Sequence, residues 1–447
     1  MAHWFHRNPL KATAVLTFDL GRQASTPLAR KVCNDIRVAR AQLLDLLPNP
    51  SHDVAVVKKA TEKYLSYLEG FITAVAAEDP KTSPEQQPKQ QTGESGGQLI
   101  LQESSSASAG RGGGESKLRN SVKITWTNSL GGKNIYQHDF LFEEINMLFN
   151  IALWLTKHAA KLASSSNEIS EEDAKEVHRS LREAAGIFKY IQDNLLHRLY
   201  ETPGDGSDLD QRILSAYEIQ CKAEAQEVTL ARAIELKHNS GLIAALAVET
   251  SKLFTKADDA LKSLDEKLVM KWRKYFQFKS VFYMSYAHCY NGNTLLNKDK
   301  GGDAVRSLRE SMSLFRQTEN LAREYGKTKG PGTVAKPQQH PFFLRLEPIV
   351  HRILEKTERE NGMIYHEKVP EELPEIDAKN MFGLANPVEY QLPARSTEWS
   401  AAAYNGFTIS AAEKKTDDKD DSVKPVKEVP VEPTDKHPSN STGCVIS

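Results

Sequence analysis

The chain has 447 residues, which is enough for one to three domains of about 150 residues, each with its own buried core. Hydrophobic residues make up 39% and charged residues 26%, and 58 Lys+Arg against 59 Asp+Glu leave a formal net charge of -1. This balance excludes a strong overall attraction to nucleic acid or to an anionic membrane. The 25 glycines and 20 prolines are ordinary in number but gathered in a few segments, which excludes collagen-like and wholly disordered chains.

Neither an export signal nor a membrane span is expected. The first residues lack the apolar core of a signal peptide, and the longest apolar run, 242–248, is far shorter than the ~20 residues of a spanning helix. A cytosolic location follows, in which thiols stay reduced. The four cysteines are Cys33, Cys221, Cys289 and Cys444. Their spacing excludes a zinc or redox pair, and we expect the first three to be core thiols.

Two short strands are expected early in the chain, within 12–18 and 122–126, because apolar and polar residues alternate there. A helical stripe begins at Pro27, directly after Thr26, and runs as far as Leu43. A second helical stripe follows it and continues to Val75. Both stripes predict amphipathic helices that face a common core.

Residues 79–120 interrupt the helical pattern. They contain prolines, a glutamine-rich stretch, three consecutive serines and three consecutive glycines. A segment of this composition buries too little apolar surface to offset the entropy of the chain. We therefore predict that 79–120 is a disordered low-complexity insert.

Seven helical stretches follow the insert. They are expected at about 137–163, 170–198, 208–237, 241–264, 267–298, 302–325 and 341–361. Ser170 with Asp173 resembles a capping box, and glycine-rich turns separate several of the stretches. Short connections favour antiparallel neighbours, and helix pairs stacked in sequence form a solenoid with a concave groove. The predicted fold is mainly α: an elongated helical solenoid with a tetratricopeptide-like core and a small β-sheet near the N-terminus.

The last part of the chain, 401–447, is predicted to be a disordered tether, because eight acids and six lysines between Glu413 and Lys436 leave it charged and solvated. The tether ends in Cys444-Val445-Ile446-Ser447, the CaaX pattern of prenylation, and the final serine favours farnesyl. A chance ending is the alternative. One farnesyl chain anchors a protein only marginally, so stable residence on a membrane needs a second signal.

The motifs in the chain do not indicate an enzyme. Gly326-Lys327-Thr328 looks like the end of a phosphate-binding loop, but the required earlier glycine would fall at Leu321, inside a helix. The histidines do not form a zinc-ligand spacing, and neither a serine nor a cysteine lies in a nucleophile elbow. We expect no catalytic residue, no metal and no cofactor apart from a covalent farnesyl lipid on Cys444, which a prenyltransferase would attach.

Several blocks of sequence resemble the BRO domain of Alix-type proteins. These blocks are 3–11, 176–181, 185–188, 221–228, 359–362 and 364–365. The run Ala223-Glu224-Ala225-Gln226-Glu227 is the most specific of them. The resemblance covers nearly the whole chain apart from 79–120, so we assign 1–400 to one BRO domain.

The resemblance implies a banana-shaped, mostly helical domain. It also implies a function: a non-catalytic, membrane-anchored adaptor that binds the amphipathic C-terminal helix of an ESCRT-III subunit in a concave apolar groove. Prenylated members of the family are associated with the nuclear envelope and its repair, so the expected location is cytoplasmic, on a membrane through the lipid anchor. The alternative is a generic helical-repeat scaffold for another cytosolic partner. Nucleic acid is not an expected partner.

The partner-binding residues that the resemblance implies are Glu171, Thr229, Arg232, Leu242, Leu246 and Tyr365. Thr229 departs from the bulky aromatic expected there in Alix. Leu242 and Leu246 share one helix face, as a groove-lining pair requires. The apolar residues on every side of that segment instead favour a core position. Tyr365 matches a family surface position proposed as a second binding patch, or it is a structural tyrosine.

Overall fold

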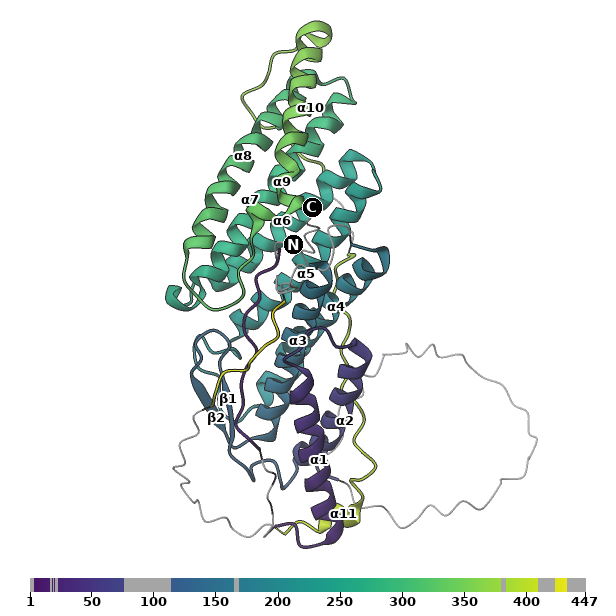
Figure 1. Cartoon of the computed structure of the whole chain (residues 1–447), viewed down its shortest axis with the longest axis vertical. Helices are drawn as coiled ribbons and strands as arrows, with labels where there is room; N and C mark the ends of the chain where they lie inside the picture. Colours follow the sequence, from purple (N-terminus) through teal and green to yellow (C-terminus); the bar gives the residue numbers. More distant parts are fainter. Residues whose placement is uncertain are drawn as a thin grey trace, which may run out of the picture.

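The computed structural model is an elongated stack of helices (Figure 1). It describes residues 4–16, 18, 20, 23–75, 114–164, 169–378, 383–408 and 423–431. The helices of ten or more residues are α1 (Pro27–Leu46), α2 (Val54–Ile72), α3 (Phe140–Ala163), α4 (Glu171–Tyr190), α5 (Gln211–Glu235), α6 (Ser240–Leu261), α7 (Glu266–Leu296), α8 (Gly301–Lys327) and α10 (Leu346–Glu360). From α2 to α8 each helix packs against the next, and α10 packs against α8. The mainly α, elongated solenoid is confirmed.

The helices begin where the sequence predicts. Thr26 caps α1, because its hydroxyl accepts the Ala29 N–H at 3.3 Å, and Pro27 occupies the first helical position. Ser170 caps α4 by accepting the Asp173 N–H at 3.0 Å. The expected stretch 170–198 ends in a π-helical turn, Ile191–Leu195, and a short 3-10 helix, Leu196–Arg198.

A two-stranded antiparallel sheet forms beside the N-terminal half of the stack. Strand β1 (Ile124–Thr127) pairs with β2 (Asn134–Gln137). The expected strand at 12–18 is reduced to a single bridge between Thr13 and Trp126. Its pairing stops there because the Lys11 backbone exchanges hydrogen bonds of 2.8 Å with the Asn150 side chain of α3 instead.

The predicted disorder of 79–120 is wrong for its last seven residues. Residues 79–113 of this segment lie outside the described part of the chain, but Leu118 and Arg119 are buried. The Arg119 guanidinium forms a bidentate ion pair with Asp139, with both N–O distances at 2.8 Å. The prediction rested on the average composition of the segment, which does not show that Leu118 and Arg119 fix its end beside the start of α3.

The predicted tether 401–447 is also wrong in two places. A short helix, α11 (Ala401–Asn405), packs against α1, and Phe407 after it is buried. Residues 423–431 pack against the domain as well, and Val431 is 4% exposed. The remaining tail residues, 409–422 and 432–447 with Cys444, lie outside the described residues.

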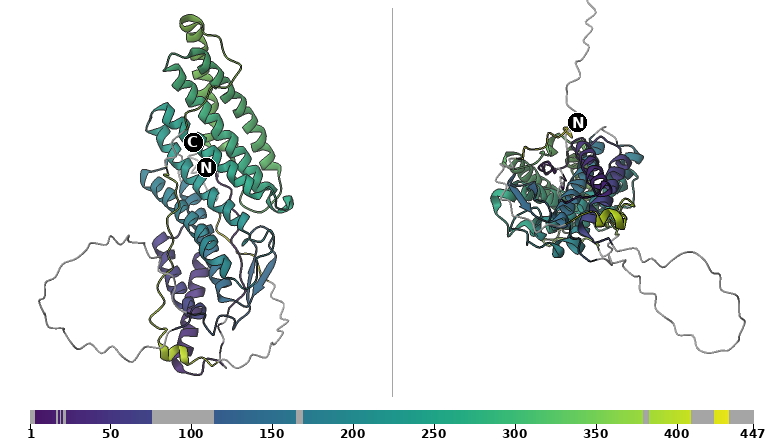
Figure 2. Two further views of the ribbon diagram at one scale, coloured as in Figure 1. Left: turned by 180° about the vertical axis from the view of Figure 1, so that it is seen from behind. Right: turned by 90° about the horizontal axis from the view of Figure 1, so that it is seen from below.

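The chain returns along the stack after α10. α10 lies at one end of the molecule and α11 at the other (Figure 1 and Figure 2). Between them, the Val388 N–H donates to the Arg182 carbonyl at 3.1 Å, and the Ser396 N–H donates to the Ser66 carbonyl at 2.9 Å. Two further short helices, the 3-10 turn Pro337–Gln339 and α9 (Pro341–Leu344), precede α10, and a π-helical turn, Asn361–Tyr365, follows it.

The N-terminal segment runs as a buried extended chain through the middle of the stack. The Arg7 guanidinium forms a bidentate ion pair with Glu224 of α5 at 2.9 and 2.7 Å. The Lys11 ammonium lies 3.0 Å from the Asp208 carboxylate. Buried charges of this kind are tolerated only when they are paired. The Arg7–Glu224 ion pair therefore connects the blocks at 3–11 and 221–228 in the interior of the domain.

The predicted core thiols are confirmed for Cys221 and Cys289, which are buried and free, whereas Cys33 is half-buried. Burial raises the pKa of Cys289 to about 12, so this thiol stays protonated. Within the described part of the chain, no helix is sufficiently long and apolar to cross a bilayer. Nor do three or more metal-ligating side chains gather there.

Candidate partner-binding groove

An apolar groove lies where α4, α5, the N-terminal segment and the turn before α10 meet. α5 supplies Glu227, Val228, Ala231, Arg232 and Glu235. These positions recur on one helical face, because they are spaced three to four residues apart. The groove encloses about 160 Å³, which is below the usual size of a site for a small molecule or cofactor and fits the anchoring side chains of a peptide.

The opposite wall comes from α4. Ala174 and Val177 are one helical turn apart and face the groove, with Ile169 just before the helix. Val177 is fully buried and packs with Leu181 in a small apolar cluster. The Ser170 cap fixes the start of α4, so this wall is rigid where it meets the groove.

Aromatic side chains form the third wall. Trp4 packs edge-on against Phe342, with ring centroids 5.9 Å apart, and lies 4.8 Å from the His340 ring. The Arg345 guanidinium lies over the Phe342 ring at 4.2 Å. Burial lowers the pKa of His340 to about 4, so its ring is neutral near pH 7 and adds no charge to the aromatic wall beside Arg345.

A buried ion pair lies beneath the groove, where Glu227 forms part of the floor. The Lys279 ammonium of α7 lies 2.6 Å from the Glu227 carboxylate, and it lies 3.8 Å from the centroid of the Trp4 ring. Burial raises the pKa of Glu227 to about 7 and lowers that of Lys279 to about 8. Each charge compensates the other inside the domain, so the pair holds Trp4 in place.

The rim of the groove carries charges of both signs. The Arg232 guanidinium lies 2.9 Å from the Glu235 carboxylate and 3.9 Å from that of Glu171. Glu171 also pairs with Lys175 at 2.7 Å, and this pairing lowers the pKa of Glu171. Such exposed pairs contribute little to stability and can exchange for charges on a ligand. The structure thus brings together two of the expected site residues, Glu171 and Arg232.

The other expected residues on α5 and α6 do not line this groove. Leu246 is 2% exposed and belongs to the main core, which corrects its expected place in an open groove. The reason is that α6 lies between α5 and α7, as its apolar residues on every side require. Leu242 is half-buried against the same core, and the Thr229 hydroxyl donates to the Ala225 carbonyl at 3.3 Å.

Tyr365 lies in a different place, at the end of the turn after α10. Its hydroxyl donates to Asp299 at 3.0 Å, and its ring packs on a cluster that contains Leu295. The neighbouring Met363 and Ile364 are 73% and 65% exposed. Tyr365 is therefore held by structural contacts beside an exposed apolar patch, separate from the groove.

Sequence reasoning missed most of the groove lining. Val228 and Ala231 occupy a stripe too short to stand out in α5, whose buried residues lie on several sides. Trp4 and Phe342 are more than 330 residues apart, and no local pattern connects them. The resembling blocks at 3–11 and 221–228 contain two of these four residues, Trp4 and Val228, and this resemblance is the one signal in the sequence that points to them.

Comparison with known proteins identifies the class. The sequence model of the BRO1-like domain matches residues 114–407. The chain belongs to the BRO1-domain family. At the level of individual proteins, it is 44% identical over 426 residues to the BRO1 domain-containing protein BROX of Xenopus tropicalis, covering 95% of this chain and 94% of that protein. It is 45% identical over 411 residues to human BROX, covering 92% of each.

Solved structures of the same fold include one described as "Structure basis for endosomal targeting by the Bro1 domain", with a TM-score of 0.58 and 19% identity, covering 88% of this chain and 94% of that one. Another is described as "ALIX BRO1 CHMP4C complex", with a TM-score of 0.58 and 16% identity, covering 90% of this chain and 98% of that one. These similarities establish the fold.

Proposed function

We propose that the protein is a non-catalytic adaptor whose groove binds the amphipathic C-terminal helix of an ESCRT-III subunit. The observation that carries this proposal is the groove itself, with three apolar walls, an internally neutralised floor and an exposed rim of mixed charge. The solved complex of ALIX BRO1 with CHMP4C supports the choice of partner.

The shape of the groove suits an amphipathic helix as the ligand better than a partner with a flat surface. An amphipathic helix presents apolar side chains at i, i+3, i+4 and i+7, and these fit a groove between two helices. Each large side chain that becomes fully buried contributes about 1.5 to 3 kcal/mol. Two or three such anchors contribute about 3 to 9 kcal/mol, part of which offsets the loss of translational and rotational freedom on binding. Arg232 and Glu171 on the rim would pair with charges beside the ligand's apolar stripe.

We further propose that prenylation of Cys444 places this adaptor on a membrane, where it contributes to remodelling or repair of the nuclear envelope. A single farnesyl chain gives marginal, reversible anchoring. An ESCRT-III polymer already assembled on the membrane would supply the second signal. The tail residues that carry the lipid lie outside the described part of the chain.

The test is a titration of a fluorescent CHMP4C C-terminal helix peptide into the folded protein. Val228→Asp introduces a charge into the half-buried wall of the groove, which is expected to weaken binding at least tenfold, because the carboxylate must lose its water when the apolar stripe of the peptide covers it. Val56→Asp makes the same substitution at an exposed position of α2 and should leave the affinity unchanged.

Two outcomes would decide against this proposal. A folded protein that does not bind the peptide would favour a scaffold for another cytosolic partner. Equal affinity of the Val228→Asp and Val56→Asp variants would show that the peptide binds elsewhere.

A further inference from the structure

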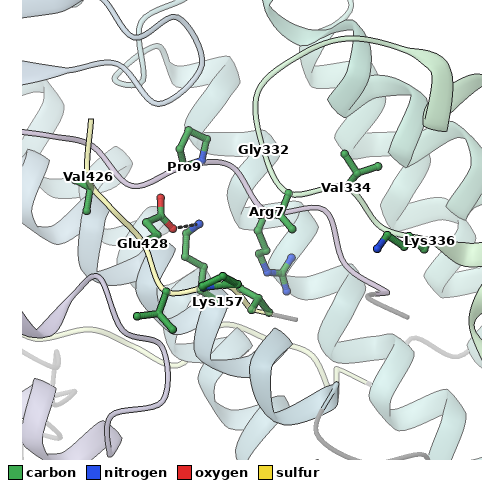
Figure 3. Close-up of a pocket in the computed structure, with 12 residues that line it drawn as sticks. Arg7, Pro9, Lys157, Gly332, Val334, Lys336, Val426 and Glu428 are labelled. Carbon is green, nitrogen blue, oxygen red and sulfur yellow. Dashed lines mark ion pairs between the residues drawn. The ribbon is translucent and has the colours of Figure 1, made fainter. Parts of the chain in front are cut away.

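Residues 423–431, here termed the strap, pack across the domain although they lie beyond the end of the BRO1-like match at 407. The strap is extended and forms neither a helix nor a strand. Val431 is buried, Val426 and Glu428 are half-buried, and Lys427 is exposed. Figure 3 shows the strap passing beside the N-terminal segment, with Glu428 directed at Lys157 of α3.

The strap is held by a few specific contacts. Both carboxylate oxygens of Glu428 are used: one accepts the Leu10 N–H at 2.7 Å, and the other lies 2.6 Å from the Lys157 ammonium. The Lys157 side chain is 4% exposed, so its charge depends on this carboxylate for compensation.

Two backbone contacts fix the rest of the strap. The Val429 N–H donates to the Pro48 carbonyl at 2.8 Å, and the Ser164 hydroxyl donates to the Val431 carbonyl at 3.3 Å. These contacts select for an extended peptide with a glutamate and, three residues later, an apolar side chain.

The strap also borders a cavity of about 480 Å³. Arg7, Lys157 and Gly332 line it together with Glu428 and Val431 of the strap (Figure 3). Because this space opens to solvent, the strap has protein packed against only part of its surface. A segment with one fully buried side chain and few backbone hydrogen bonds belongs to the least stable class of structural elements.

We infer that the channel occupied by the strap is a peptide-binding site of this protein, with Val426 to Val431 as its ligand in cis, and that the strap detaches while the domain stays folded. Lys157 and the Leu10 N–H recognise the glutamate, and a socket beside Ser164 receives the valine. The family match ends at residue 407, before this segment, and within the strap only Val431 is fully buried against the main core.

Detachment of the strap would change the reach of the end of the chain. With the strap bound, the 13 residues from 432 to Cys444 span at most about 45 Å; with it released, the 36 residues from 409 to Cys444 span at most about 125 Å. The bound strap also ends at Ser164, next to Ala163 of the groove wall. This consequence for membrane anchoring rests on the proposed prenylation of Cys444.

The experiment opens the site in the full-length chain with Glu428→Lys combined with Val431→Asp, and then offers a labelled peptide of residues 421–433 in trans. We expect the peptide to bind the opened variant at least tenfold more tightly than the unmodified protein, whose site is occupied. Lys427→Ala, an exposed change within the same segment, should behave like the unmodified protein. Hydrogen exchange should show faster exchange of the Leu10 amide in the opened variant only.

Each remaining outcome decides against the inference. A large drop in melting temperature of the opened variant would show that the strap is an integral part of the fold. A folded opened variant that does not bind the peptide would show that the channel is not a binding site. Titration of the groove peptide against the same variant keeps this failure distinct from a failure of the proposed function. As a specificity check, Lys157→Glu is placed in a chain opened by Glu428→Ala and Val431→Asp, whose own strap lacks a matching lysine. This chain should lose binding of the native peptide and bind a peptide with Glu428→Lys.

Discussion

Truncation of Leu246 to alanine distinguishes a core position from a groove position. Leu246 is 2% exposed, and its environment is formed by the helices on either side of α6. Removal of a buried leucine side chain costs about 2 to 5 kcal/mol, because the lost transfer free energy adds to the cavity that remains. We therefore expect Leu246→Ala to lower the free energy of unfolding by about 3 kcal/mol.

The corresponding shift in melting temperature follows from the size of the chain. An unfolding entropy of about 2.1 cal/mol/K per residue over 447 residues gives about 0.9 kcal/mol/K, so the loss amounts to about 3 to 4 °C. Val228→Ala removes a half-buried side chain that faces the groove, and its cost should stay below about 1 kcal/mol.

The assay pairs a circular dichroism melt with a peptide titration on each sample. Leu246→Ala should lower the melting temperature and leave the affinity nearly unchanged, whereas Val228→Ala should do the reverse. A Leu246→Ala protein with an unchanged melt and weakened peptide binding would refute the assignment of Leu246 to the core. It would also restore the groove position that the family resemblance implies.

Three further predictions concern charge and anchoring. Burial lowers the pKa of His6 to about 3, so below pH 6.5 this histidine binds a proton in the unfolded chain but stays neutral in the folded chain. The free energy of unfolding should therefore fall by about 2 kcal/mol from this residue between pH 7.5 and 5. Urea unfolding of His6→Gln should show a smaller dependence on pH. Arg119→Met leaves the buried Asp139 carboxylate unpaired and should cost about 3 to 5 kcal/mol in the same assay, whereas a loss below 1 would contradict the pairing. Cys444→Ser should preserve the melt and shift the protein from membrane to soluble fractions; unchanged fractionation would show that the folded domain carries targeting.

The long helices could be predicted from sequence because each buries one stripe against its neighbours and starts at a recognisable cap. α4 begins at the predicted Ser170, and the stretches expected at 241–264 and 302–325 differ from α6 and α8 by three residues or fewer at each end. Hydrophobic periodicity is a local property, so it is visible in sequence whatever the helix packs against.

The packed ends of the polar segments could not be predicted in the same way. Residues 114–120 and 423–431 are held by the ion pairs of Arg119 with Asp139 and of Glu428 with Lys157, together with isolated hydrogen bonds, rather than by periodic apolar contacts. Average composition cannot reveal a pair whose two members are distant in sequence. The groove could not be predicted for a similar reason, because its lining combines residues as distant in sequence as Trp4 and Phe342.

The most direct test of the central claim is the affinity of the CHMP4C C-terminal helix peptide for the folded chain, measured by fluorescence anisotropy on the unmodified protein and on Val228→Asp. The groove predicts micromolar binding that weakens at least tenfold in the variant while the melting temperature holds. A peptide that does not bind, or that binds both proteins equally well, would contradict the claim that this groove is the partner-binding site.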